Sequence, residues 1–92
     1  MTVRELTEAE LARKRGRVEA LGEVECRTMF HKNGTSSIQV ASDEARQRLL
    51  HMAQQKGAHF IVFEPHLELP GRAGKDDTLI LSARVYGHTL YS

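Results

Sequence analysis

Five histidines and one cysteine are the side chains of this chain best suited to binding a metal ion. A first-row metal needs three or four such ligands that converge within about 2 to 2.3 Å of one point. Cys26, His59 and His66 are the best candidates, although His59 and His66 fall on opposite faces of a regular strand. The competing interpretation is that Cys26 is a small core residue and that the histidines are surface or strand-end residues.

The usual catalytic patterns do not occur in the sequence. Ser36 lies in a segment with neither a G-x-S-x-G motif nor an adjacent base. Glu23 and Glu25 share one expected strand face with Arg27, an arrangement typical of solvated cross-strand charges. We therefore expect that the protein is not an enzyme and needs no cofactor.

Length and charge narrow the range of functions further. A chain of 92 residues, 40% apolar and 27% charged, fits one domain whose core only just outweighs chain entropy, so oligomerisation would stabilise it. With 13 basic and 12 acidic side chains, the net charge of +1 creates no long-range attraction for nucleic acids or acidic membranes. A single cysteine forms no internal disulfide, and neither a membrane span nor a signal peptide is recognisable.

The N-terminal segment predicts a helix from Thr2 to Arg15, because Thr7 and Glu10 have the spacing of a capping box and Gly16 is a natural stop. We treat residues 1–16 as a helical arm and residues 17–92 as a single α+β domain. The basic run that follows the acidic first turns is also typical of a solvated helix with a cationic C-terminus. Six residues in or next to this arm are candidates for contacting a partner: Leu6, Leu11, Arg13, Lys14, Arg15 and Arg17.

Alternation from Arg17 to His31 predicts a long strand with one buried face and a bend at Gly22. The residues expected on the buried face are Val18, Ala20, Gly22, Val24, Cys26, Thr28 and Phe30.

A hairpin turn is predicted at Lys32-Asn33-Gly34-Thr35, with a return strand from Ser36 to Ala41. A two-residue Asn-Gly loop would place Ile38 and Val40 on the charged side of the hairpin, whereas a bulge at Gly34 would place them on the apolar side. We favour the bulged loop, because burying both side chains would stabilise the fold by about 3 to 5 kcal/mol.

Residues 42–63 predict a capped helix that leads into a buried strand. Ser42 is a suitable N-cap, and Lys56 with Gly57 is a suitable C-terminal end. Ala45, Leu49, Met52 and Ala53 form one apolar stripe. Phe60-Ile61-Val62-Phe63 is apolar on both faces, which indicates a central strand beneath the helix.

The rest of the chain predicts a bulge or sheet edge at Pro65, a loop over residues 70–77, and a last strand from Thr78 to Tyr91. The element order is therefore α-β-β-α-β-β. We expect an α+β fold in which an antiparallel sheet of three to four strands carries one main helix on a face, plus the N-terminal helix.

Three segments follow one another along the chain: LGEVEC (Leu21 to Cys26), EARQRLLHMAQQKGAHFIVF, and a strand ending in SARVYG (Ser82 to Gly87). Their order and motifs resemble those of the small bacterial envelope domains of the RcsF-like lipoprotein sensors and their YbjQ-like relatives. The matching positions are Ala45, Leu49, Ala53, Gly57, Ala58 and Val62. His59 replaces the usual asparagine, and the paired cysteines of the sensors are absent. The resemblance covers residues 21–87 and implies a non-enzymatic α+β domain, assembled into rings in the YbjQ-like branch. The secreted YdgH-type βαββ domains share this outline.

We expect a non-catalytic interaction or assembly module that contacts another protein, or further copies of itself, through a sheet edge or the N-terminal arm. One alternative is a metal or small-ligand binder that uses Cys26, His59 and His66. Another is a nucleic-acid binder that uses the basic N-terminal residues with Arg46 and Arg48. The resemblance implies a periplasmic or envelope location and a link to envelope stress, and without it the cytoplasm is the expected compartment.

Overall fold

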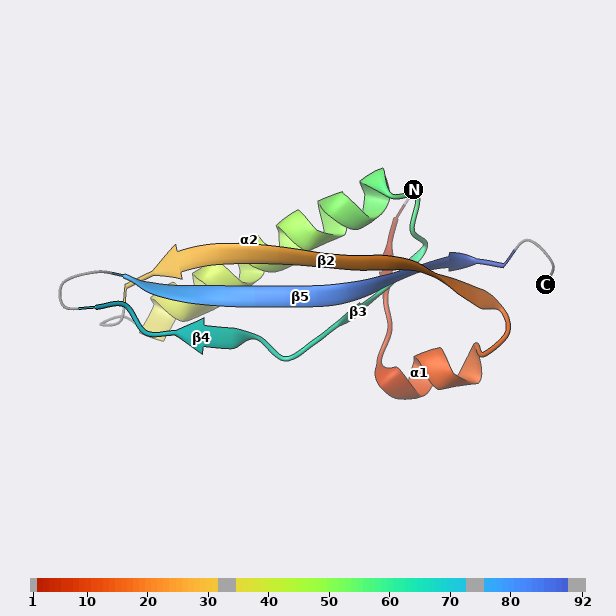
Figure 1. Ribbon diagram of the computed structural model, residues 1–92, viewed down its shortest axis with the longest axis horizontal. Coiled ribbons are helices and arrows are strands. Elements are labelled where there is room, and N and C mark those ends of the chain that lie inside the picture. The colour runs from red at the N-terminus through yellow and green to blue at the C-terminus, as the bar shows by residue number, and fades with distance from the viewer. Residues whose placement is uncertain (1, 32–34, 73–75, 90–92) are drawn as a thin grey trace.

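Two long strands pair along most of their length and form the centre of the fold. The computed structural model describes residues 2–31, 35–72 and 76–89. In it, β2 (Val18–Phe30) lies antiparallel to β5 (Asp77–His88), as Figure 1 shows. Alternation predicted strands over residues 17–31 and 78–91, and both are confirmed to within a residue or two in their described parts.

Three shorter strands complete the sheet on the other side of β5. β3 (Phe60–Phe63) pairs antiparallel with β5 and parallel with β1 (Arg4–Glu5). β4 (Leu67–Leu69) pairs with β5 beyond Pro65, and the strand order is β1-β3-β5-β2. The central strand predicted at 60–63 is therefore confirmed. The expected antiparallel sheet of three to four strands is corrected to a mixed sheet of five strands.

The hairpin predicted after residue 31 is wrong. α2 (Thr35–Gln55) includes the residues expected to form the return strand, and the turn residues 32–34 lie outside the described ranges. The reason is helical spacing: Ile38 and Ala41 extend the stripe of Ala45 and Leu49 by two turns, which a strand would interrupt. Val40 consequently remains 63% exposed. Ser42 lies within α2 and is not its N-cap.

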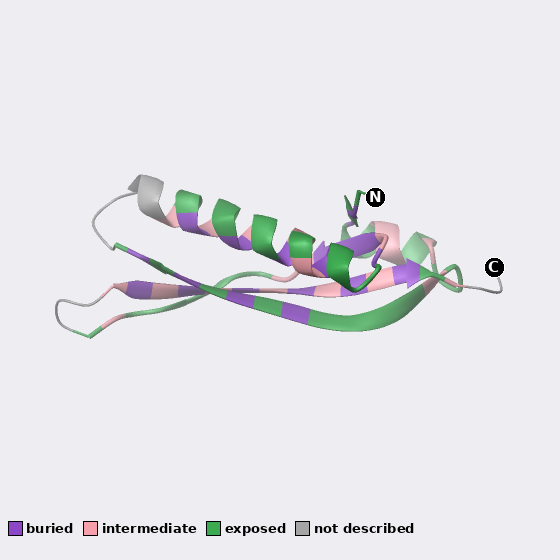
Figure 2. Cartoon of the chain, turned by 90° about the horizontal axis from the view of Figure 1, so that it is seen from above, coloured by how far each residue is buried: buried purple, intermediate pink, exposed green. Residues whose placement is uncertain are grey.

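α2 covers one face of the sheet. Figure 2, coloured by burial, shows buried residues on the side of the helix that is turned toward the sheet. Leu49 of the helix and Ile61 of β3 are fully buried in one core cluster, with Met52 and Phe63 packed against it. Gly57 ends the helix with φ +75°, and the Ala58 amide donates to the Ala53 carbonyl at 3.0 Å. The predicted apolar stripe and glycine end are confirmed.

α1 (Glu8–Arg13) lies against the opposite face, at one end of the sheet (Figure 1). The capping box of Thr7 and Glu10 is confirmed, since each backbone N–H bonds to the other side chain. The predicted helix from Thr2 to Arg15 is too long, because residues 4–5 form β1: the amides of Arg4 and Leu6 donate to the carbonyls of His59 and Ile61. The element order is therefore β-α-β-α-β-β-β.

A β-bulge at residues 20–22 divides β2 into two parts. Ala20 stands opposite Tyr86 and Gly22 opposite Val85, so Leu21 is an extra residue, and Gly22 has φ +126°. Before the bulge, Val18 packs with α1 against the cluster that contains Phe60. After it, the even-numbered residues face α2. The predicted bend is confirmed, and only the second part of β2 has the predicted buried face.

Candidate functional site

The three predicted metal ligands have separate surroundings. Cys26 is buried in β2, with its Sγ 3.8 Å from the Thr28 hydroxyl oxygen. The ring of His59 lies 4.5 Å from that of His88, and His66 Nε2 lies 3.2 Å from Glu68 Oε1. Within the described ranges, no three histidine, cysteine, aspartate or glutamate side chains gather where they could hold a metal ion.

Part of the predicted partner-binding arm is used inside the molecule. Leu6 is buried with Phe60 and Val62, and Leu11 packs against them. The Lys14 ammonium lies 5.1 Å from the centre of the Phe60 ring. Arg13, Arg15 and Arg17 are exposed. The apolar side of the arm is therefore occupied by the protein's own sheet, and its exposed side is basic.

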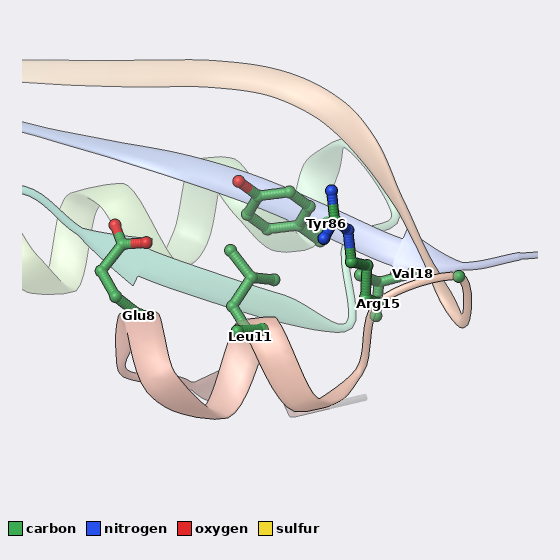
Figure 3. A pocket seen from close by; sticks show the side chains of 7 residues that line it. Glu8, Leu11, Arg15, Val18 and Tyr86 are labelled. Atoms are coloured by element: carbon green, nitrogen blue, oxygen red, sulfur yellow. The ribbon is translucent and has the colours of Figure 1, made fainter.

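A hollow of about 360 Å³ lies between α1 and the sheet (Figure 3). Figure 3 shows Leu11 pointing toward Tyr86, with Glu8 and Arg15 on either side. The Glu8 carboxylate accepts a hydrogen bond from Arg84. The described residues that line the hollow include no serine, cysteine or histidine, so it contains none of the usual nucleophiles next to a base.

The outer edge of β2 offers backbone groups to a partner. The Glu64 amide donates to the Ser82 carbonyl at 2.9 Å, so the even-numbered residues of β5 turn their N–H and C=O groups toward β3. The odd-numbered residues of β5 turn toward β2, where they stand opposite Val24, Cys26 and Thr28. Four residues of β2 therefore direct their backbone groups outward: Glu23, Glu25, Arg27 and Met29. No strand of the described chain pairs with that side.

The same four residues place their side chains on the face away from α2. All four are exposed, whereas Val24, Cys26, Thr28 and Phe30 are buried. Arg27 Nε lies 3.2 Å from Glu25 Oε1, with the two side chains 69% and 52% exposed. An ion pair this exposed adds little stability to the monomer. Both charges can therefore turn to a partner at small cost.

Exposed apolar side chains also lie at one end of this edge. The described chain exposes five large ones, of which Leu21 and Met29 belong to β2 and Val40 lies beside it on α2. Met29 and Val40 line a hollow of about 270 Å³ at the end of β2, together with Thr28, Phe30, His31, Ala41 and Glu44. The other two, Leu67 and Leu69, belong to β4. The edge of β2 thus combines free backbone groups, both signs of charge and apolar surface.

Comparison with known proteins leaves this geometry as the main guide to function. No family model matches the chain, and a search of curated proteins finds no significant match. Neither described helix has the length and apolar character that crossing a membrane requires.

The sequence identified the faces of β2 but not its role as an edge. Alternation indicated that Glu23, Glu25 and Arg27 share a solvated face, and this is confirmed. Which backbone groups point outward depends on the strand order, and strands distant in sequence determine that order. The charges of Glu23, Glu25 and Arg27 indicated a solvated face, which a central strand can also have, so they did not mark β2 as an edge.

Proposed function

We propose that the protein is a non-catalytic interaction module that binds a protein strand at the outer edge of β2. The observation that carries this proposal is the row of outward N–H and C=O groups from Glu23 to Met29, which has no partner strand in the described chain. An extended peptide can add to such an edge by backbone hydrogen bonding, and its side chains then determine specificity.

The composition of the edge supports the same conclusion. Proteins that avoid edge pairing shorten the edge strand, twist it with a β-bulge, or place proline or charged residues, especially lysine, on it. Residues 23–30 contain neither lysine nor proline. Before them, the bulge at Gly22 disturbs only one end of β2. The stretch is therefore long and regular enough to accept a partner.

Glu25→Pro tests the proposal directly. The Glu25 amide points away from β5, so proline removes a donor that the partner needs and leaves the β2–β5 ladder intact. Glu25→Thr is the matched control, because it loses the same charge and keeps the amide. The fold of both variants is checked by circular dichroism, and binding of another protein, or of further copies of the chain, is measured by sedimentation.

We expect the wild type and Glu25→Thr to bind, and Glu25→Pro to lose binding. Residue-resolved hydrogen exchange provides a second readout. The amides of Glu25 and Arg27 should exchange freely in the monomer and become protected in the complex, whereas those of Val24 and Cys26 should be protected in both. Equal binding by all three proteins, with no new protection at Glu25 and Arg27, contradicts the proposed function.

A further inference from the structure

We infer that the strand bound at this edge is β2 of a second copy, paired antiparallel about a two-fold axis at Cys26. The inference rests on the proposed function, and it deepens that proposal by naming the partner and the register. With the axis at Cys26, Glu25 stands opposite Arg27 of the second copy, and Arg27 opposite its Glu25. Glu23 stands opposite Met29 in the same way. Every opposed pair on this face then consists of residues with outward backbone groups.

Charge distinguishes this register from its neighbours. An axis at Glu25 or at Arg27 places two like charges opposite each other at the centre of the interface. An axis at Val24 opposes Glu23 with Glu25 twice, and an axis at Thr28 leaves Arg27 opposite Met29. An axis between two residues would oppose side chains from different faces of the pleat. The register centred on Cys26 opposes glutamate with arginine twice and has no like-charge pair. An axis at Glu25 also opposes Glu23 with Arg27 twice, but it does so around a central Glu25–Glu25 pair.

The face toward α2 is compatible with this axis. Cys26 would stand opposite Cys26 of the second copy, and Val24 would stand opposite Thr28 of the second copy. All three side chains are small and already nearly buried, at 3% to 9% exposure. They leave room for two strands to approach closely across the axis.

The exposed apolar side chains also meet across this axis. Phe30 would stand opposite Gly22 of the second copy, which has no side chain to obstruct it. Leu21 of the second copy would then stand opposite His31, next to the hollow lined by Met29 and Val40. Two of the five large apolar side chains exposed in the described chain, Met29 and Val40, would therefore lie beside the second copy in each protomer.

A charge exchange tests the register. Glu25→Arg alone and Arg27→Glu alone each place like charges opposite one another at two positions, so the dissociation constant of the dimer should rise by about tenfold or more. The double variant Glu25→Arg/Arg27→Glu restores both opposite-charge pairs and should bring the dissociation constant back to near the wild-type value. Sedimentation equilibrium measures the constants, and circular dichroism checks that all four proteins are folded.

Disulfide formation gives an independent test, since Cys26 is the only cysteine of the chain. Directly opposed residues that do not share hydrogen bonds have Cα atoms about 4.5 Å apart, within the range that a disulfide spans. Oxidation with diamide should therefore link two wild-type chains. The control Cys26→Ser/Thr28→Cys should link poorly, because position 28 faces Val24 of the second copy.

The outcomes separate the two proposals. A dimer in which the double variant fails to recover affinity, or in which Cys26 does not crosslink, overturns the register. If the Glu25 and Arg27 amides are nevertheless protected in that dimer, binding at the edge stands. A wild-type chain that stays monomeric at all concentrations overturns self-pairing. In that case the binding of a different protein is compared between Glu25→Pro and Glu25→Thr, and equal binding overturns the proposed function as well.

Discussion

β1 and β2, the strands at the two ends of the order β1-β3-β5-β2, differ in how they end the sheet. β1 consists of Arg4–Glu5 alone, yet it is held from both faces, because Val3 is buried in the cluster under α2 and Leu6 in the cluster under α1. Glu5 also accepts a hydrogen bond from Arg46 of α2. β2 is 13 residues long, and after the bulge only one of its faces is buried.

This contrast shows how a small protein can control where it binds. A very short strand pinned by a side chain on each face offers a partner little backbone to pair with. A long strand with a solvated, charged face offers a continuous row of backbone groups. Variants that affect one edge, both edges or neither can therefore test whether the two edges behave independently.

Leu49→Ala should have the largest effect and should weaken both edges. Leu49 is fully buried in the cluster that joins α2 to β2, β3 and β5, so the substitution should lower the free energy of unfolding by about 2 to 5 kcal/mol. Urea denaturation measures the loss. Hydrogen exchange should show amides at β1 and β2 losing protection together, and a loss confined to one edge would show that the sheet does not unfold as a unit.

Leu6→Ala should weaken the β1 edge alone. Leu6 is 2% exposed, but its cluster is small, so we expect a loss of about 2 kcal/mol, at the low end for such a substitution. The amides of Arg4 and Leu6, which bond to β3, should exchange faster while those of Val24 and Cys26 are unchanged. Leu11→Ala, at a partly exposed site, is the milder control. Equal loosening of β2 would rule out independent edges.

Gly22→Ala should affect the β2 edge alone, by about 1 to 2 kcal/mol. A Cβ at Gly22 would meet nothing within 4 Å, so the cost comes from its φ of +126° and not from crowding. Gly87→Ala is the matched control, because its φ is not positive and its Cβ would instead press on Leu21 Cδ1 at 3.2 Å. An unchanged melting temperature for Gly22→Ala would mean that the bulge relaxes without cost.

Acid should have the smallest effect, at the capping box of α1. Hydrogen bonds from the backbone and side chain of Thr7 lower the pKa of Glu10 below its ordinary value of 4.5. A carboxylate whose pKa is lower in the folded state stabilises the fold above the unfolded pKa, and this contribution is lost as the pH falls through the folded pKa. NMR titration should show the Thr7 amide shifting in that range. Glutamine in Glu10→Gln can still accept the hydrogen bond from the Thr7 amide but does not titrate, so the pH-dependent shift of that amide should disappear.

Much of the fold could be predicted from local patterns. Alternation identified β2 and β5, and the i, i+4 stripe identified the buried side of α2. The Thr7–Glu10 spacing identified the capping box of α1, although the helix was predicted to begin at Thr2. Gly22 and Gly57 marked a bulge and a helix end because both adopt positive φ angles that other residues avoid. Each of these signals lies within a few residues of the element that it predicts.

The errors have non-local causes. Ile38 and Val40 fit a strand by alternation, but the stripe that begins with Ile38 gains more from packing as a helix on β2 and β5. β1 is too short to show any period and exists because β3 offers it a partner. Binding through a sheet edge was expected from the sequence, but the edge was not assigned to β2, since strand order determines which side of β2 remains unpaired.

The bulge in β2 also affects how the chain can vary in length. If Leu21 were kept but paired with Tyr86, alternation would continue unbroken, and Val18 would move from the α1 side of the sheet to the α2 side. Deletion of Leu21 should instead remove the bulge and leave Ala20 opposite Tyr86 and Val18 opposite His88. The first part of the strand should therefore tolerate the loss of this one residue and keep the face that packs with α1.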